Sequence, residues 1–438
     1  MNFRSTFSLS NFAICLVCLA YSSTALSGYK VFLDPRSMAM GGTGVASASK
    51  FNASAHNPAL IAFNRGDKPD KIYLAINSGQ RQLYGESFNS DVLDYQNSPI
   101  EQDFINAANS GDISDTRDTA KLLKDSLSEK SFSSYRSDEM HNFNLLVDTD
   151  PLTINFYTRR EIRKVSTILN KDAATIDDIV RQVETTGLAE STGIEDLLSS
   201  SVESTQFDYE EMGATVATTN VIDYNMPISW GFTPKLIQFN ASQVSRPLDE
   251  YDVNNAPADR PSDSNLEWNV DIGLAILFTD NFLREEFGLD GWWLEGEWVF
   301  GISGMNMFPT DISTFSPPVP TDELPRGKPS VQARYKVGLA TYREDYMMTL
   351  DIDLNEDEVF AFEGNTRFIS FGGEYYWRDD FHLRAGARFN IAETEEASKE
   401  DHTLTAGFLY QPRHFNIEAA FMLSEVEAGG SIGFGLAF

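Results

Sequence analysis

The sequence has few cysteines, few basic residues and no long apolar run. Its 438 residues include two cysteines, Cys15 and Cys18, both near the start of the chain. No run of about 18 apolar residues occurs, which excludes a transmembrane helix. Lysine and arginine number 34 against 65 aspartates and glutamates, so the net charge is −31. Nucleic-acid binding requires a basic surface, and we therefore expect no direct nucleic-acid partner.

The sequence also lacks the residue patterns that mark common enzymes. No G-x-S-x-G nucleophile motif occurs. The glycine pair at positions 42 and 44 lacks the third glycine of a dinucleotide-binding loop. The five histidines are scattered and show no metal-ligand spacing: His56, His141, His382, His402 and His414. We therefore expect no enzyme activity, no cofactor and no metal site.

Residues 1–27 are typical of a secretory signal peptide. They carry one charge, Arg4, followed by the apolar run Phe12–Tyr21 and a stretch of small residues. The apolar run is too short to span a membrane. We expect cleavage between Ser27 and Gly28, which would remove both cysteines and leave a mature chain without thiols or disulfides.

Strict alternation of apolar and polar residues is the main positive signal. Between Leu266 and Phe278 every second side chain is bulky and apolar, and similar patterns cover 331–342, 346–355 and 382–391. Strands of about 9–11 residues with one apolar face fit a bilayer, whereas strands in soluble sandwiches average about 5–6 residues. The pattern predicts an all-β, antiparallel outer-membrane β-barrel of about 14 strands within residues 66–438.

The end of the chain supports this prediction. Ile432, Phe434, Leu436 and Phe438 share one face of the last predicted strand, opposite small residues. A final strand that ends on an aromatic residue resembles the C-terminal signature of bacterial outer-membrane barrels. We therefore expect Phe434, Leu436 and Phe438 to act as an assembly signal for the barrel-assembly machinery of a Gram-negative cell, with outer-membrane lipid around the barrel.

The predicted connections alternate between long and short along the chain. Transmembrane barrels have short periplasmic turns and long outer loops, so we expect both termini to face the periplasm. Residues 100–130 and 159–205, in the first two long connections, have helical patterns. These helical insertions are predicted to cover the barrel mouth, to contact a partner, or to pack as a loop domain without one.

Charged side chains lie on the polar faces of several predicted strands. A short turn at residues 343–344 would place Arg334 opposite Asp353 and Lys336 opposite Asp351, and each such pair contributes about 0.2–1 kcal/mol. The charges either select permeants or form a ladder that fixes strand register. The candidate lumen charges are Arg334, Lys336, Asp351, Asp353, Glu374, Arg384 and Arg388, with Glu374 predicted opposite Arg384.

Residues 34–63, DPRSMAMGGTGVASASKFNASAHNPALIAF, resemble the start of the TraF-like conjugal transfer family, which is related to FadL- and PorV-type outer-membrane barrels. The segments 230–236, 350–377 and 383–390 resemble the same family. The residues that carry the first resemblance are Arg36, Met38, Met40, Gly41, Gly42, Gly44, Val45, Ala46, Asn57, Pro58, Ala59 and Leu60.

The resemblance implies an N-terminal plug, residues 28–65, inside the barrel. It implies a role in conjugal transfer, with a secretion or conjugation partner, or in the passage of a hydrophobic small molecule. The alternative is a non-conducting barrel that binds a partner through its outer helices. The plug would either gate the barrel or seal it permanently. The candidate plug or gating residues are Arg36, Gly41, Gly42, Gly44, Asn57, Pro58 and Ala59.

Overall fold

The computed structural model describes the chain in thirteen stretches. These are residues 33–63, 72–84, 88–131, 133–149, 151–187, 193–222, 226–252, 263–288, 291, 294–311, 330–357, 365–392 and 402–438. The expected signal peptide and its cleavage site, Ser27 and Gly28, lie outside the described residues, as do residues 28–32, 64 and 65 of the expected plug.

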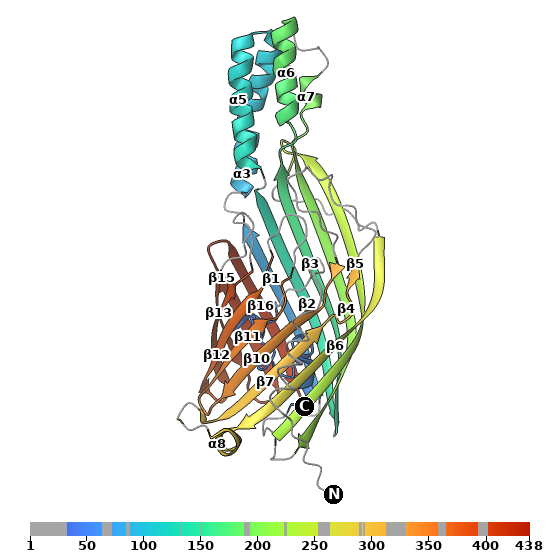
Figure 1. The fold of residues 1–438 in the computed structure, drawn as a ribbon, viewed down its shortest axis with the longest axis vertical. Helices are drawn as coiled ribbons and strands as arrows, with labels where there is room; N and C mark the ends of the chain where they lie inside the picture. Colours follow the sequence, from blue (N-terminus) through green and yellow to red (C-terminus); the bar gives the residue numbers. More distant parts are fainter. Residues whose placement is uncertain are drawn as a thin grey trace.

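Within the described residues, fourteen strands form one closed antiparallel barrel, which confirms the predicted fold class (Figure 1). Each strand pairs with the next along the chain, and the last pairs with the first. The strands are β1 (Ile72–Tyr84), β2 (Ser134–Thr149), β3 (Leu152–Leu169), β4 (Ser201–Ile222), β5 (Met226–Pro247), β6 (Asp263–Thr279), β7 (Glu297–Met305), β10 (Arg334–Tyr342), β11 (Tyr346–Asp353), β12 (Phe368–Arg378), β13 (Phe381–Asn390), β14 (Thr403–Tyr410), β15 (Phe415–Leu423) and β16 (Glu427–Ala437). A separate pair, β8 (Thr310–Asp311) and β9 (Ser330–Val331), follows β7.

The first and last strands close the barrel. The backbone N–H of Ile72 donates to the carbonyl of Phe438 at 3.0 Å, and the N–H of Phe438 donates back at 2.9 Å. Phe434, Leu436 and Phe438 all point to the outer surface of β16 and are exposed there. The predicted apolar face of the last strand is therefore the outer face of the wall.

The wall has an apolar outer face and a polar inner face. On β5, Trp230, Phe232 and Leu236 are exposed, whereas Thr233 and Lys235 between them are buried in the lumen. Exposed tryptophan, phenylalanine and leucine side chains recur on other strands in the same alternation. A band of this kind faces hydrocarbon in transmembrane barrels. No helix among the described residues combines the length and the apolar character needed to cross a membrane.

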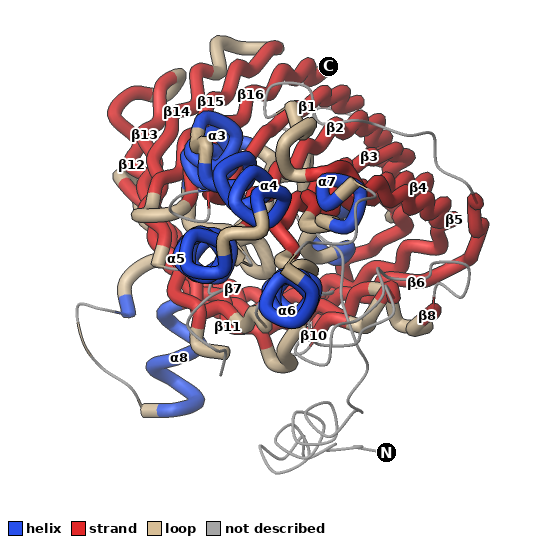
Figure 2. Tube along the Cα trace, turned by 90° about the horizontal axis from the view of Figure 1, so that it is seen from above, coloured by secondary structure: helices blue, strands red, loops and turns tan. Residues whose placement is uncertain are grey.

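Strands β2 to β5 rise well beyond the rest of the barrel and carry a group of helices, which we call the crown (Figure 1). Seen from above, these helices stand in front of the barrel mouth (Figure 2). The crown has its own buried core, centred on Phe104, Leu123, Leu127, Ile176 and Val183. It consists of α3 (Phe88–Asn97), α4 (Ile100–Ser110) and α5 (Ile113–Lys130) between β1 and β2, and of α6 (Ala173–Thr186) and α7 (Ile194–Leu197) between β3 and β4.

The predicted helical insertion at 159–205 is wrong at both ends. Residues 159–169 continue β3, and residues 201–205 already belong to β4. The charges in this stretch alternate between the two faces of a strand. Arg159 is buried in the lumen, whereas Arg160 faces outward and pairs with Asp208 across the sheet. The helical prediction for 100–130 holds, apart from the short break between α4 and α5.

The predicted pairing of Arg334 with Asp353 and of Lys336 with Asp351 is also wrong. Lys336 lies opposite Asp353, and Gly338 lies opposite Asp351. The turn lies one residue later than predicted, since the N–H of Arg343 donates to the carbonyl of Tyr346 at 2.8 Å and only residues 344 and 345 lie between them. This displacement of the turn by one residue shifts the register by two residues. The predicted pairing of Glu374 with Arg384 is confirmed.

A short helix, α8 (Asp280–Phe287), follows β6 at the end of the barrel where the C-terminus lies (Figure 1). Inside the barrel lies the N-terminal stretch 33–63, which we call the luminal segment. It contains the helix α2 (Pro35–Ala39) and two 3₁₀ turns, η1 (Ala53–Ala55) and η2 (Pro58–Ala62).

Candidate functional site

One carboxylate organises the luminal segment. Asp34 precedes α2, and its Oδ1 accepts hydrogen bonds from the backbone N–H of Ser37 at 3.0 Å and from Asn52 Nδ2 at 2.6 Å. Its Oδ2 lies 2.8 Å from His56 Nε2. Burial acts to raise the pKa of Asp34, but the His56 ring and the hydrogen bonds outweigh burial and hold this pKa below its usual value. Asp34 therefore ties the first turn of the segment to residues 52 and 56.

Hydrogen bonds from several strands attach the luminal segment to the wall. Asp351 on β11 accepts from the backbone N–H groups of Gly44 at 2.7 Å and Val45 at 2.9 Å through one carboxylate oxygen. On β14, the hydroxyl of Thr405 accepts from Gly41 N–H and donates to the carbonyl of Ala39. Further bonds come from Ser229 on β5, Ser303 on β7 and Ser431 on β16.

The luminal segment touches the wall most closely where the strands carry glycine. A Cβ atom on Gly386 would lie 2.3 Å from the carbonyl carbon of Met40, and one on Gly231 would lie 2.4 Å from that of Pro58. Any side chain at these positions would have to displace backbone. At eight further wall glycines a Cβ atom would also lie within 3.0 Å of an atom of the luminal segment: Gly79, Gly273, Gly301, Gly338, Gly372, Gly407, Gly433 and Gly435. The segment and the wall therefore fit each other on nearly every side of the barrel.

All seven candidate plug residues lie in the luminal segment. Gly41 and Gly42 adopt φ values of 69° and 91°, which side-chain-bearing residues rarely adopt. Asn57 Nδ2 donates to the carbonyls of Val45 at 2.7 Å and Leu274 at 3.0 Å, so it joins two parts of the segment to β6. The seven residues are Arg36, Gly41, Gly42, Gly44, Asn57, Pro58 and Ala59.

The candidate lumen charges line the inner wall, and each has a partner. Lys336 Nζ lies 2.7 Å from Asp353 Oδ1, and Arg334 pairs with Asp357. Arg384 bridges Glu374 at 2.9 Å and Glu418 at 2.7 Å, Arg388 pairs with Glu427 at 2.8 Å, and Asp351 binds the luminal segment. The structure does not bring these charges together at one point but spreads them along β10 to β13.

Two further charge clusters were not predicted from the sequence. On β2, Asp138 accepts hydrogen bonds from Arg81, Arg136 and Arg163, all of them buried in the lumen. On β5, Lys235 Nζ lies between Glu211 Oε2 at 3.2 Å and Asp271 Oδ2 at 2.9 Å. The sequence signal for both clusters is the alternation of inward- and outward-facing residues in β1 to β6, strands that are longer than the expected length of about 9–11 residues.

A cavity of about 530 Å³ lies on the side of the luminal segment away from the crown, near the short turns between neighbouring strands. Its lining is mixed, since it includes Arg36, Lys50, Tyr73, His382 and Glu418. This cavity has no continuous apolar wall.

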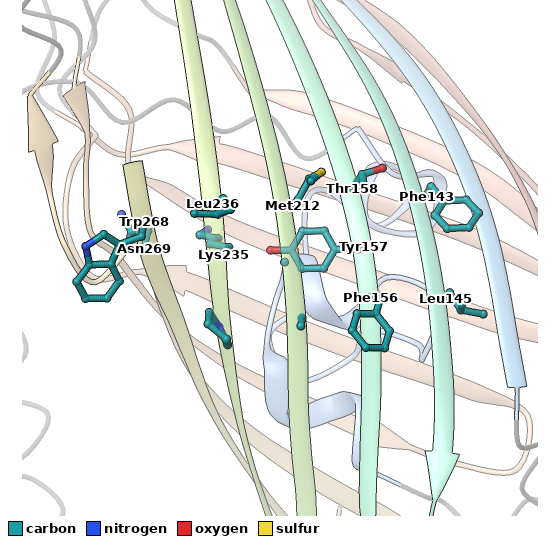
Figure 3. A pocket seen from close by; sticks show the side chains of 13 residues that line it. Phe143, Leu145, Phe156, Tyr157, Thr158, Met212, Lys235, Leu236, Trp268 and Asn269 are labelled. Carbon is teal, nitrogen blue, oxygen red and sulfur yellow. The ribbon is translucent and has the colours of Figure 1, made fainter. Parts of the chain in front are cut away.

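An apolar groove of about 550 Å³, which we call the lateral groove, lies on the outer wall across β2 to β6 (Figure 3). Its outward-facing lining includes Phe156, Met212, Leu236 and Trp268, which are all exposed. Its deeper lining consists of residues whose side chains belong to the inner face: Tyr157, Gly213, Lys235 and Asn269. The lateral groove is therefore a hollow in the outer face whose floor is formed by residues with inward-pointing side chains.

Two local features distinguish the wall at this point. The paired positions of β4 and β5 are interrupted between Gly213, opposite Lys235, and Val216, opposite Phe232. Pro234 lies in this interruption and has no N–H to donate. Gly213 adds no side chain to the inner face, and the ring of Tyr157 occupies that place. Gly231 on β5 touches Pro58 of the luminal segment, and Lys235 lies further along β5 toward the crown. The lateral groove therefore lies on the crown side of the luminal segment.

Comparisons with known proteins agree with this architecture. A family model described as the F plasmid transfer operon TraF protein matches residues 54–364, well over half of the chain. The deltaS2S3 mutant of the monoaromatic hydrocarbon channel TodX aligns with 94% of this chain and all of its own, at 13% identity and a TM-score of 0.52. That likeness concerns the fold.

Two other channels align at lower scores. The toluene transporter TodX of Pseudomonas putida aligns with 94% of this chain and 98% of its own, at 11% identity and a TM-score of 0.33. The monoaromatic hydrocarbon channel CymD covers 94% and 99%, at 12% identity and 0.36. A comparison with curated proteins found no match.

Proposed function

The chain belongs to the F plasmid transfer operon TraF protein family, and we propose that it is an outer-membrane β-barrel that passes small apolar molecules sideways through its wall. A structure that shares its fold, the deltaS2S3 mutant of TodX, is described as a monoaromatic hydrocarbon channel. This chain would take the same class of cargo, apolar molecules of modest size, from its lumen into the surrounding hydrocarbon.

The lateral groove is the observation that carries the proposal. It is apolar on the outside, reaches inner-face residues at Tyr157 and Lys235, and lies on the crown side of the luminal segment. A molecule that enters from the crown side meets the luminal segment as a floor and the lateral groove as a side exit. Transfer from the polar lumen to hydrocarbon is favourable by about 25 cal/mol per Å² of apolar surface.

The luminal segment then serves as a fixed seal. Its contacts with glycines, hydroxyls and carboxylates on most strands argue against displacement as one body. In this scheme the lumen charges hold the segment and the strand register and do not select cargo. The outer membrane stays closed to polar solutes while apolar molecules leave through the wall.

Filling the lateral groove tests the proposal. Ala214 faces outward and lines the groove, so Ala214→Trp should occupy it without touching the luminal segment. The host is a Gram-negative strain with low background uptake, and the probe is N-phenyl-1-naphthylamine, which fluoresces when it reaches phospholipid. We expect cells with the wild-type chain to take up the probe faster than empty cells, and Ala214→Trp to remove most of that difference.

The matched control is Phe421→Trp, which enlarges an exposed side chain on β15, away from the lateral groove. It should keep the wild-type rate. Equal rates for Ala214→Trp and the wild-type chain, at equal amounts of folded barrel, would contradict passage through the wall.

The crown supports a second candidate function, docking of a partner such as a conjugation component. It has its own core, and ion pairs join its helices, with Arg117 Nε 2.6 Å from Glu184 and Lys124 Nζ 2.7 Å from Asp177. Replacement of residues 173–197 by a short glycine–serine linker should abolish a partner complex and leave probe uptake unchanged. Retention of the complex would contradict docking through α6 and α7.

A further inference from the structure

The cavity on the side of the luminal segment away from the crown, which we call the basal cavity, has the size of a small-molecule site. Its volume is about 530 Å³, and such sites typically measure about 300–1,000 Å³. Its walls are the luminal segment and the inner-face side chains of strands near their short turns. The luminal segment lies between this cavity and the lateral groove, so a site here does not rest on the proposed passage through the wall.

Aromatic side chains form much of the wall of the basal cavity. Phe51 and Tyr73 meet edge to face, with their ring centroids 5.5 Å apart. Tyr342 donates its hydroxyl to the carbonyl of Ala46 at 3.2 Å, and Tyr376 lines the cavity as well. These contacts hold the rings in place. The cavity therefore offers a preformed aromatic surface to the apolar body of a ligand.

The cations of the basal cavity are already paired with carboxylates. Three cations line it, and each lies within 2.9 Å of a carboxylate oxygen. The pairs are Arg36 with Glu374, Arg384 with Glu374 and Glu418, and Lys50 with Asp148. Three positive charges thus face three negative ones, and these pairs leave no net charge for a ligand to compensate.

Glu297 differs from the other carboxylates of the basal cavity. It begins β7 on the same face as Val299, which packs against the luminal segment, and it is partly buried. Glu297 makes no ion pair or hydrogen bond through its side chain within the part of the chain that the structure describes. Tyr342 lies directly opposite it on β10, where neighbouring inner-face side chains are in reach of each other. The cavity therefore has one unpaired negative charge beside an aromatic ring.

A carboxylate next to an aromatic ring favours a cation. The face of the ring attracts an ammonium group within about 6 Å of its centroid. The carboxylate attracts the same group, and partial burial strengthens this attraction relative to bulk water. An anion would be repelled by Glu297 and would find the cations of the cavity already occupied by Glu374, Glu418 and Asp148.

We infer that the basal cavity binds a small organic cation, an amine with an aromatic or apolar body. Its ammonium group lies between Glu297 and Tyr342, and its body packs against the rings of the cavity wall. The ligand reaches the cavity from the side away from the crown, because the luminal segment separates the cavity from the crown side of the lumen.

Three probes of nearly equal size and different charge test this inference. They are 2-phenylethylamine, 2-phenylethanol and 3-phenylpropionate, which at pH 7 are positive, neutral and negative. The chain without residues 1–27 is folded in an uncharged maltoside detergent, and binding is measured by titration calorimetry against detergent alone. The test variant is Glu297→Gln. The matched control is Glu295→Gln, which removes an exposed carboxylate two residues earlier, outside the cavity lining.

We expect 2-phenylethylamine to bind the wild-type chain about 10-fold more tightly than 2-phenylethanol, since an ionic hydrogen bond to Glu297 is made by the amine alone. 3-Phenylpropionate should bind no better than the alcohol. Glu297→Gln should remove most of the preference for the amine, and Glu295→Gln should retain it. Heat-modified mobility on a gel checks that both variants fold, and the comparison of probes on the wild-type chain needs no variant.

Several results would overturn the inference. These are equal affinities for the amine and the alcohol, tightest binding of 3-phenylpropionate, or no heat of binding with the amine. Equal losses in Glu297→Gln and Glu295→Gln would also overturn it, because they would assign the effect to surface charge in general. None of these results bears on passage through the wall, which the uptake assay with Ala214→Trp tests separately.

Discussion

The guanidinium of Arg36 and the carboxylate of Glu374 form a two-pronged ion pair, with Nη1 3.1 Å from Oε1 and Nη2 2.8 Å from Oε2, although 338 residues separate them. Glu374 also accepts a hydrogen bond from Arg384 and lies 3.2 Å from His382. This pair joins the start of the luminal segment to β12 on the wall.

Loss of this pair should destabilise the barrel. Removing one partner of a buried ion pair costs about 3–5 kcal/mol, and Glu374 keeps Arg384, so we expect Arg36→Met to lie at the low end of that range. Arg36→Lys keeps the charge but loses the two-pronged geometry, so its cost should be smaller. Urea unfolding of the refolded barrel measures both, and a wild-type midpoint for Arg36→Met would contradict the expectation.

The close fit of the luminal segment predicts a contrast between two glycines on adjacent strands. Gly386→Ala places a methyl group against the backbone of Met40 and should cost about 1–3 kcal/mol through overpacking. Gly373→Ala meets its nearest neighbour at 3.6 Å and should change stability by less than about 0.5 kcal/mol. Each variant is heated in steps before electrophoresis, and the measurement is the temperature at which the faster-running band of the folded barrel disappears from the gel. Equal temperatures for the two variants would mean that the segment does not press on β13.

Among single residues of the wall, Asp351 should contribute most to anchoring residues 44 and 45 of the luminal segment. Asp351→Ala leaves two buried N–H groups without an acceptor, and each orphaned donor costs about 1–3 kcal/mol. Asp351→Asn retains an acceptor oxygen and should cost less. Limited proteolysis at neutral pH reports whether the segment loosens, and resistance of Asp351→Ala equal to that of the wild-type chain would contradict the assignment.

The pKa of Asp34 gives a pH dependence with a definite sign. Its folded-state pKa is below its usual value, so the stabilisation is complete above the ordinary carboxyl pKa of about 3.9 and is lost as the pH falls through the folded value. Asp34→Asn removes the titration. The difference in unfolding free energy between the wild-type chain and Asp34→Asn should therefore shrink from pH 7 to pH 3. A difference that stays constant would contradict this.

Much of the barrel could be predicted because its signal is local. Each alternating segment, such as 266–278, identifies its own outer face without reference to any partner strand, and the last strand ends on Phe438 in the same pattern. The register of a hairpin depends instead on its turn. The bond from Arg343 to Tyr346 places the turn after β10 one residue later than predicted, and Lys336 therefore lies opposite Asp353.

Contacts between distant parts of the chain could not be predicted from local patterns. The long strands β3 and β4 carry charges on both faces, which obscures the alternation, so the sequence of 159–169 alone does not identify a strand. The lateral groove needs Tyr157, Gly213 and Pro234 from three strands, and none of the three has a distinctive sequence environment. Resemblance to a family identifies Arg36, Gly41 and Asn57, whereas only the structure identifies their partners on the wall.

The most direct test of passage through the wall is to lock the luminal segment and measure uptake. Asn155 Nδ2 on β3 donates to Ser54 Oγ of the segment, and the sequence has cysteine only at positions 15 and 18. In Ser54→Cys/Asn155→Cys, oxidation or a short thiol cross-linker joins the segment to the wall, and mass spectrometry confirms the link. We predict that locked and reduced barrels take up N-phenyl-1-naphthylamine at the same rate. A locked barrel that falls to the rate of empty cells would show that the segment must move, and would contradict a fixed seal with a lateral exit.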